Sequence, residues 1–154
     1  MEWASNGSLG DILFEESFIA NEKFARTMFR QLIDALSYMH ANKSAHLDIK
    51  PENILVSEDY SLKLADFDMS YKEGDIMVLC KGTKNYRPLE QFQCKVRDVK
   101  AVDIYSAGIV LFCMFFGNLP YLEEGKINGI DLQKLLKNDI EAFWNVHQSF
   151  HPKN

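Results

Sequence analysis

The chain has 154 residues, which is long enough for one compact domain with a buried core. Hydrophobic residues make up 47% and charged residues 25%, as in ordinary globular proteins, so extensive disorder is not expected. The formal net charge of −5 and the lack of a run of Lys and Arg argue against a nucleic-acid-binding surface.

The sequence predicts neither a membrane span nor a secreted protein. The longest apolar stretch, Ala107 to Phe116, is shorter than the roughly 20 residues that cross a bilayer. The N-terminus lacks the basic region and apolar core of a signal peptide. Cys80, Cys94 and Cys113 are far apart and odd in number, which indicates reduced thiols. We therefore expect a cytoplasmic protein.

In chain order, a turn at residues 5–8 precedes two predicted helices. The first helix is expected from Asp11 to Ile19. The second is expected to start after Asn21, which is a good N-cap, and to stop near Asn42. Its apolar residues recur at helical spacing, and they are Phe24, Met28, Phe29, Leu32, Leu36 and Met39.

A polar segment containing Pro51 comes next and is followed by a predicted β-hairpin. Ile54 to Val56 and Leu62 to Ala65 are short apolar runs joined by five polar residues, a pattern typical of a hairpin. Asp66 to Glu90 has weak periodicity and is interpreted as a long ordered loop, a kind of segment that is often functional.

The last third of the chain predicts two more helices. Asp103 to Phe116 is apolar nearly all round, which indicates a helix buried in the core and ended by Gly117, Asn118 and Pro120. Asp131 to Asn138 carries its leucines on one face and predicts a further helix. The expected fold class is therefore mainly α (α+β) with one small β-hairpin.

Four polar side chains stand out by their spacing. A hairpin that returns the chain would bring Asp66 close to Asn53, and an acid beside an amide offers oxygen ligands that suit Mg²⁺ bound with phosphate. Asp48 would then be free to act as a base or orienting group, and Lys50 would supply positive charge for a phosphoryl group. Either acid alone would more often be a turn or cap residue, and only the joint spacing favours a site.

The order of these residues resembles the motifs of protein kinases, H-R-D-L-x-x-x-N, D-F-G and A-P-E. The matching stretches are His46-Leu47-Asp48-Ile49-Lys50-Pro51-Glu52-Asn53, Asp66-Phe67-Asp68 and Pro88-Leu89-Glu90. Gly82-Thr83-x-x-Tyr86 is similar to the peptide-positioning loop of the family, and residues 103–108 to the start of its central helix. From its first residues to about Tyr121, the chain resembles the C-terminal lobe of a eukaryotic Ser/Thr protein kinase.

The resemblance implies a role for each matching residue. Asp48 would orient the substrate hydroxyl and accept its proton, Lys50 would neutralise the γ-phosphate, and Thr83 would brace both. Asn53 and Asp66 would be the ligands of Mg²⁺. His46 would stack on Phe67, and Asp103 would bind the backbone of the catalytic loop.

The resemblance also implies an ATP site. The first residues look like the hinge, so that the backbone of Glu2 and Ala4 would face the adenine, with Ser8 near the ribose and Leu55 under the ring. The expected ATP-binding residues are Glu2, Ala4, Ser8, Lys50, Asn53, Leu55 and Asp66.

A partial kinase domain is expected over residues 1–154, with the hinge at 1–10, the core of the C-lobe at 11–122 and incomplete late helices at 123–154. The Gly-rich loop and the strand lysine of an N-lobe do not occur in the sequence, so the chain alone is expected to be inactive.

Two departures from the family pattern bear on function. Leu47 replaces the arginine that grips a phosphorylated activation loop, so activity is expected not to depend on phosphorylation there. Asp68 replaces glycine, which restricts the backbone. The favoured function is transfer of phosphate from ATP, with Mg²⁺, to Ser or Thr of a protein substrate. The alternative is a non-catalytic kinase-like module that binds partners.

Overall fold

The computed structural model describes residues 4–15, 18, 21–76, 81–121, 126–127, 130–131 and 140–148, and all structural statements concern these residues. The helices are α1 (Leu9–Leu13), α2 (Glu22–Ala41), α3 (Leu89–Phe92), α4 (Val99–Phe116) and α6 (Ile140–Gln148). Two short 3-10 helices are η1 (Pro51–Asn53) and η2 (Lys84–Tyr86). The strands are β1 (Ser44–Ala45), β2 (Ile54–Val56), β3 (Leu62–Leu64), β4 (Tyr71–Lys72), β5 (Lys126–Ile127) and β6 (Ile130–Asp131).

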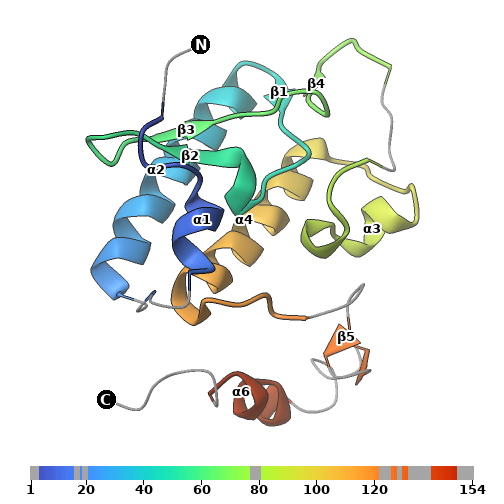
Figure 1. The fold of residues 1–154 in the computed structure, drawn as a ribbon. Coiled ribbons are helices and arrows are strands. Elements are labelled where there is room, and N and C mark those ends of the chain that lie inside the picture. The colour runs from blue at the N-terminus through green and yellow to red at the C-terminus, as the bar shows by residue number, and fades with distance from the viewer. Residues whose placement is uncertain are drawn as a thin grey trace.

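Helices α2 and α4 pack against each other and form the scaffold of the molecule (Figure 1). Helix α2 begins where the side chain of Asn21 accepts hydrogen bonds from the backbone N–H groups of Lys23 and Phe24, at 2.9 and 3.3 Å. The helix ends with Asn42 as its C-cap. Both bounds confirm the sequence prediction. Its buried residues recur every three or four positions, and they are Ala25, Met28, Leu32 and Leu36.

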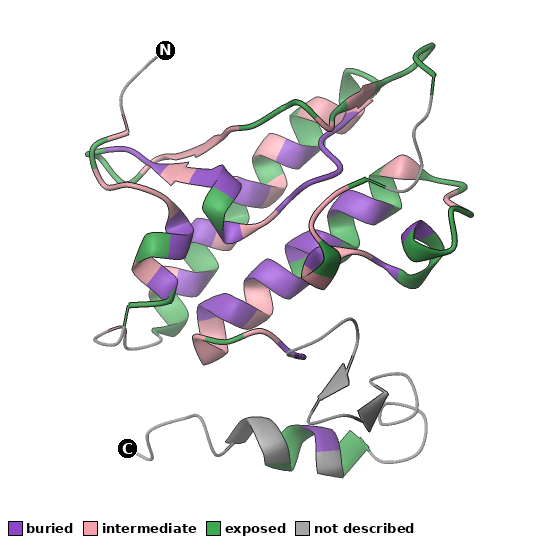
Figure 2. Ribbon diagram, turned by 45° about the vertical axis from the view of Figure 1, so that its right-hand side comes forward, coloured by how far each residue is buried: buried purple, intermediate pink, exposed green. Residues whose placement is uncertain are grey.

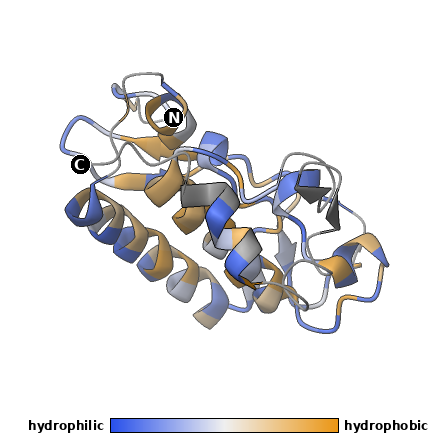
Figure 3. Cartoon of the chain, turned by 90° about the horizontal axis from the view of Figure 1, so that it is seen from below, coloured by the Kyte–Doolittle hydropathy of each residue, from blue (hydrophilic) through white to orange (hydrophobic). Residues whose placement is uncertain are grey.

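Helix α4 is the most buried long element, shown in purple along its inner side in Figure 2. Its N-cap is Asp98, which accepts a hydrogen bond from the N–H of Lys100 at 2.9 Å, and Gly117 ends it in the left-handed conformation, at φ 65°. The helix therefore starts one turn earlier than the predicted Asp103. Hydrophobic residues, orange in Figure 3, gather where the helices face one another.

By length and composition alone, α4 is long and apolar enough to cross a membrane, but the core helix of a soluble protein can be equally long and apolar. Eight of its residues are buried inside the protein, so this one helix does not show a span.

Within the described residues, the strands form three two-stranded antiparallel sheets. Strands β2 and β3 form the predicted hairpin, with Ile54 opposite Leu64 and Val56 opposite Leu62. The pairing of β1 with β4 was not predicted, because it joins the polar segment to part of the stretch interpreted as loop. The predicted α+β class, with helices dominant and small sheets, is confirmed.

Three other expectations need correction or lie outside the described residues. The first helix spans Leu9–Leu13 and not Asp11 to Ile19. Asp131 belongs to strand β6, and the rest of the helix expected there, at 132–138, falls outside the described residues. Cys94 is disulfide-bonded, so the prediction of reduced thiols is wrong for this residue and the cysteines do not support a cytoplasmic location. Cys113 is free and buried.

Candidate active site

The loop between β1 and η1 is anchored on a buried acid of α4. The carboxylate of Asp103 is fully buried and accepts hydrogen bonds from the backbone N–H groups of His46, at 2.9 Å, and Leu47, at 2.8 Å. Nε2 of His40, near the end of α2, lies 2.8 Å from the same carboxylate. Because a buried carboxylate needs such partners, these contacts fix the loop relative to both long helices.

Asp48 lies in this loop and is surrounded by hydrogen-bond donors. Its Oδ1 accepts from the backbone N–H of Thr83 at 2.7 Å and from the Thr83 hydroxyl at 2.8 Å. Its Oδ2 lies 2.9 Å from Nζ of Lys50 and accepts from Nδ2 of Asn53 at 3.0 Å. Burial opposes ionisation of Asp48, but the hydrogen bonds from Lys50 and Thr83 outweigh it and hold the pKa of the carboxyl below its usual range.

Lys50 and Thr83 also contact each other, because Nζ of Lys50 donates to the Thr83 hydroxyl at 2.9 Å. The three side chains that the sequence predicts to be catalytic thus form one connected cluster. The segment that carries Thr83 can approach the loop that carries Asp48 this closely because the residue before Thr83 is a glycine, Gly82. Gly82 adopts a φ of +101°, and a Cβ built on it would lie 2.7 Å from the carbonyl oxygen of Leu47.

Two side chains that the sequence analysis did not single out hold this second segment in place. The guanidinium of Arg87 donates two hydrogen bonds to the carbonyl oxygen of Gly82 and lies over the ring of Phe92 at 5.6 Å. The amide of Gln91, which is buried, donates to the carbonyl oxygen of Lys81. No periodic pattern marks either residue, so only the folded contacts reveal them.

Asn53 is oriented so that its amide oxygen is left for another partner. Its Nδ2 donates to the backbone oxygen and to Oδ2 of Asp48, both at 3.0 Å, and two acceptors there require the NH₂ group to face them. The backbone oxygen of Asn53 accepts from the N–H of Ala65 at 2.9 Å. Asp66 follows directly, so the hairpin brings Asn53 and Asp66 to the same end of the β2–β3 pair.

The donor set at this end of the hairpin fits Mg²⁺ held together with a phosphate. An amide oxygen and an exposed carboxylate are hard ligands, and Mg²⁺ is usually bound by one or two carboxylates with waters and substrate phosphates. Among the described residues, no group of three or more His, Cys, Asp or Glu could hold a metal ion alone. Asp66 has a φ of 60°, a conformation uncommon outside glycine and concentrated at functional sites.

The segment after Asp66 is fixed by a ring contact. The rings of His46 and Phe67 are in contact, with centroids 5.0 Å apart, but they are tilted by 50° and not stacked as the family resemblance implies. Nε2 of His46 also lies 3.0 Å from the carbonyl oxygen of Ala65. His46 therefore links the loop that carries Asp48 to the segment that carries Asp66.

The expected adenine site is placed only in part. Residues 6–8 run beside β2, where the backbones of Asn6 and Gly7 exchange hydrogen bonds of 3.1 and 2.9 Å with Val56. Ser8 forms an isolated bridge with Leu55, so these two predicted residues lie side by side.

Ser8 has a further local task that the sequence analysis missed. Ser8 is the N-cap of α1 and forms a capping box with Asp11: its hydroxyl accepts from the N–H of Asp11 at 3.1 Å, and the Asp11 carboxylate accepts from the N–H of Ser8 at 2.8 Å. The pattern Ser-x-x-Asp in the sequence is the signal that could have revealed it. The backbone oxygen of Ala4 accepts from Gly7 in a turn. Glu2 lies outside the described residues.

Comparison with known proteins gives one family. A family model described as "Protein kinase domain" matches residues 1–153. The chain is 35% identical over 123 residues to a carbon catabolite-derepressing protein kinase of Secale cereale, covering 79% of this chain and 24% of the relative. It is 34% identical over 142 residues to serine/threonine protein kinase OSK3 of Oryza sativa subsp. indica, covering 91% and 27%.

A third relative is the maternal embryonic leucine zipper kinase of Danio rerio, 35% identical over 125 residues, with 79% of this chain and 18% of the relative covered. The chain therefore spans about a quarter or less of the length of these curated relatives.

Proposed function

The chain belongs to the protein kinase family, and from this membership we propose that it transfers the γ-phosphoryl group of ATP to Ser or Thr hydroxyls of proteins. The observation that supports this most strongly is the network around Asp48, which joins Lys50, Asn53 and Thr83 within 3.0 Å. Residues of these types, in this arrangement, suit a reaction in which catalysis is mostly positioning and charge stabilisation.

In the proposed site, Asp48 orients the acceptor hydroxyl. Its lowered pKa keeps it ionised at neutral pH, so an oxygen of the carboxylate can accept a hydrogen bond from the hydroxyl and take its proton as phosphate is transferred. Lys50 places an ammonium 2.9 Å from Asp48, where positive charge stabilises the transferring group. Thr83 keeps both side chains in position.

Asn53 and Asp66 would hold Mg²⁺ at the open end of the hairpin, where the ion supplies charge neutralisation for the phosphates of ATP. The amide oxygen of Asn53 is directed by the two bonds of its NH₂ group to Asp48. The side chain of Asn53 therefore links the proposed metal site to the proposed catalytic base, Asp48. Ser8 and Leu55, which form a β-bridge with each other, would lie beside the nucleoside of ATP. The backbone of Ala4 would lie next to the adenine.

We also propose that the chain divides into a hinge at 1–10, the core of the C-lobe at 11–122 and incomplete late helices at 123–154. The support for this division is the antiparallel run of residues 6–8 along β2, which places the segment assigned to the hinge against the hairpin that bears Asn53. The proposal that protein substrates are phosphorylated concerns the whole protein and not the 154-residue chain alone.

The binding half of the proposal can be tested on the purified chain. Mg²⁺-ATP is expected to raise the melting temperature, and ATP with EDTA is expected not to. Asn53→Ala and Asp66→Ala should each reduce the shift. Glu58→Ala is the matched control, because Glu58 is an exposed acid in the turn at the other end of the same hairpin. Equal shifts in all four proteins would contradict the assigned metal ligands.

Phosphoryl transfer decides between an enzyme and a partner-binding module. The full-length gene product is expected to phosphorylate Ser and Thr peptides. Stabilisation by Mg²⁺-ATP without transfer by that product would support the non-catalytic alternative.

A further inference from the structure

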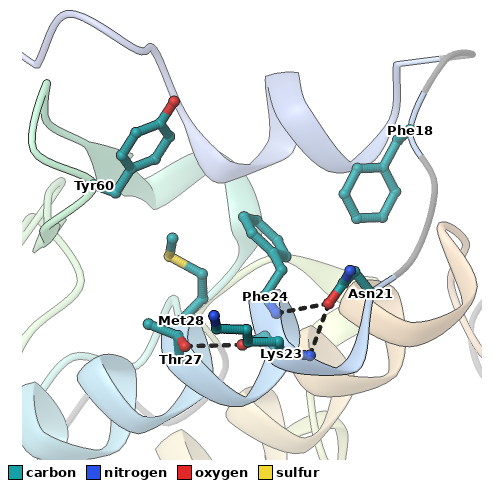
Figure 4. Close-up of a pocket in the computed structure, with 7 residues that line it drawn as sticks. All are labelled: Phe18, Asn21, Lys23, Phe24, Thr27, Met28 and Tyr60. Carbon is teal, nitrogen blue, oxygen red and sulfur yellow. Dashed lines mark hydrogen bonds between the residues drawn. The ribbon is translucent and has the colours of Figure 1, made fainter.

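A pocket of about 470 Å³ lies away from the proposed active site, where the start of α2 faces the tip of the β2–β3 hairpin (Figure 4). Its walls are mainly apolar. The rings of Phe18 and Phe24 meet edge to face with centroids 5.8 Å apart, Met28 is buried at the base, and Tyr60 stands on the opposite side. The volume is in the range of pockets that bind small ligands or side chains.

Tyr60 is held in a conformation that a bulky residue rarely adopts. Its φ is 62°, in the turn between β2 and β3, where glycine or asparagine would be far less strained. The turn is clamped from α2, because the amide of Gln31 donates to the carbonyl oxygen of Tyr60 at 3.2 Å and accepts from the N–H of Leu62 at 2.9 Å. Although placed there at a conformational cost, the tyrosine remains 61% exposed. Strained residues of this kind concentrate at ligand-binding positions.

The polar groups around the pocket are mostly donors. Lys23 makes no ion pair among the described residues, while its neighbour Arg26 is paired with Glu22 at 2.6 Å. The Nδ2 of Asn21 has no hydrogen-bond partner in the described part of the chain, since the bonds of that side chain are made by its oxygen. The Thr27 hydroxyl already donates to the backbone of α2. A ligand that complements this rim carries an acceptor with negative charge.

The pocket opens to solvent, because four of its seven lining residues are exposed: Asn21, Lys23, Thr27 and Tyr60. A small molecule normally buries most of its surface in its site, which this shape does not allow. A peptide needs to insert only one side chain, and its flanking residues can stay at the rim.

We propose that this pocket, which we call the Tyr60 pocket, docks an acidic peptide segment of a partner protein. One bulky apolar side chain of the peptide enters between Tyr60, Phe24 and Met28. An Asp or Glu next to it pairs with the ammonium of Lys23. The affinity of the peptide would come chiefly from its buried apolar side chain. The charge pair with Lys23 would set the direction in which the peptide binds and would exclude basic sequences.

The Tyr60 pocket and the proposed active site can be occupied together. Tyr60 lies at the turn of the hairpin, whereas Asn53 and Asp66 lie at its open end. Along α2, Met28 and His40 are 12 residues apart, which corresponds to roughly 18 Å of helix. Docking therefore does not depend on phosphoryl transfer, and it can be measured without ATP.

The test is selection of random displayed peptides on the immobilised 154-residue chain, followed by fluorescence anisotropy with the enriched peptides and with decanoate as a competing small acid. Enriched sequences are expected to share a Phe, Leu or Trp with Asp or Glu within two positions. Tyr60→Gly should weaken their binding at least tenfold while leaving the fold intact, because glycine relieves the positive φ. Lys23→Glu should weaken binding to a similar extent.

Two controls match these variants. Tyr38→Ala removes an exposed tyrosine further along α2, and Lys95→Glu reverses an exposed lysine elsewhere, so both should bind as the native chain does. The methyl NMR signal of Met28 should shift on binding. The proposal is overturned by the failure of any peptide to be enriched, by basic enriched sequences, or by equal binding to the Tyr60→Gly chain. Binding of decanoate in preference to every peptide would overturn it in favour of a small acid.

Discussion

At the scale of single residues, Thr83 is the point where the site is most tightly connected. Its hydroxyl donates to Asp48 at 2.8 Å and accepts from Lys50 at 2.9 Å, while its backbone N–H donates to the same carboxylate. One side chain therefore sets the distance between the proposed base and the proposed phosphate-neutralising cation. The backbone bond survives any substitution, so the contribution of the hydroxyl can be isolated.

Thr83→Ala in the full-length protein removes one hydrogen bond from each of two charged groups. Bonds of this kind are worth about 1.5–3 kcal/mol, so kcat is expected to fall about 10- to 100-fold. The acidic limb of the pH–rate profile should also move to higher pH, because a hydrogen bond that lowers the pKa of Asp48 is lost. Thr83→Ser keeps the hydroxyl and should retain most of the activity. Equal loss in Ala and Ser variants would show that packing of the methyl group matters instead.

At the scale of elements, the loop that carries Asp48 owes its position to α4. Asp103→Asn keeps the shape of the side chain but turns one acceptor into a donor. A buried N–H of His46 or Leu47 then loses its partner, and the free energy of unfolding should fall by about 1–3 kcal/mol. Urea denaturation measures this. Substitution of Asp98, the exposed N-cap of the same helix, by Ala is the comparison, and it should reduce stability by about 0.5–2 kcal/mol without lowering kcat in the folded protein. Unchanged stability of Asp103→Asn would contradict the anchoring role.

In the family pattern an arginine precedes the catalytic Asp and can bind a phosphate on the segment after Asp66. This chain has Leu47 at that position, and the segment is held there by apolar packing. Leu47 is buried in a small apolar cluster with Ala45 and Val102, against which Met69 and Tyr71 pack. A phosphate on the segment would find no cation at position 47 to bind. Phosphatase treatment of the active full-length protein is therefore expected to leave its rate unchanged. Leu47→Arg should not improve activity, because it would place a charge in the cluster. Abolition of activity by phosphatase would show that another basic residue binds a phosphate.

Much of the arrangement could be predicted from the sequence, for identifiable reasons. Helix α2 has an N-cap at Asn21 and a regular apolar stripe, and both are local signals. The hairpin follows from two apolar runs joined by a polar turn. The contacts among Asp48, Lys50 and Thr83 follow from the motif resemblance, because residues 33 and 35 positions apart cannot be paired by local pattern.

The rest depends on tertiary contacts or on capping residues at the starts of helices. Strands β1 and β4 have two residues each, which is too short for a periodic pattern, and their pairing is set by the fold. The partner of His40 is 63 residues away. The starts of α1 and α4 lie earlier in the chain than predicted, directly after the N-caps Ser8 and Asp98, so the capping residues mark these starts better than the apolar residues do.

At the scale of the whole molecule, ionisable groups limit stability at both ends of the pH range. Asp11, Asp48, Asp59 and Glu73 have pKa values held below their ordinary values of 3.8 and 4.5, chiefly by hydrogen bonds, although burial opposes this at Asp48. The folded state favours their charged forms. Their contribution is present above the ordinary values and is lost as the pH falls through the lower, folded-state pKa values.

The buried groups act at the alkaline end. Burial raises the pKa of Cys113 to about 12 and raises the pKa of Tyr86 and Tyr121 as well. Because the folded state favours the neutral forms, their contribution is full below the unfolded-state values of 9.0 and 10.0 and declines as the pH rises beyond them. Urea midpoints of the chain should be level between about pH 5 and 8.5 and fall on both sides. Cys113→Ala should make the alkaline decline shallower, and an unaltered decline would contradict the assignment to this thiol.

If Asp48 is the catalytic base of a Mg²⁺-dependent kinase site, its loss must slow the single-turnover transfer of phosphate from ATP to a Ser/Thr peptide. The measurement compares the full-length protein with its Asp48→Asn variant at saturating Mg²⁺-ATP. Transfer is expected to require Mg²⁺ and to fall about 10²- to 10⁴-fold in the variant, with the affinity for Mg²⁺-ATP little changed. Equal transfer rates in the two proteins, or no transfer by the native protein despite binding of Mg²⁺-ATP, would contradict it.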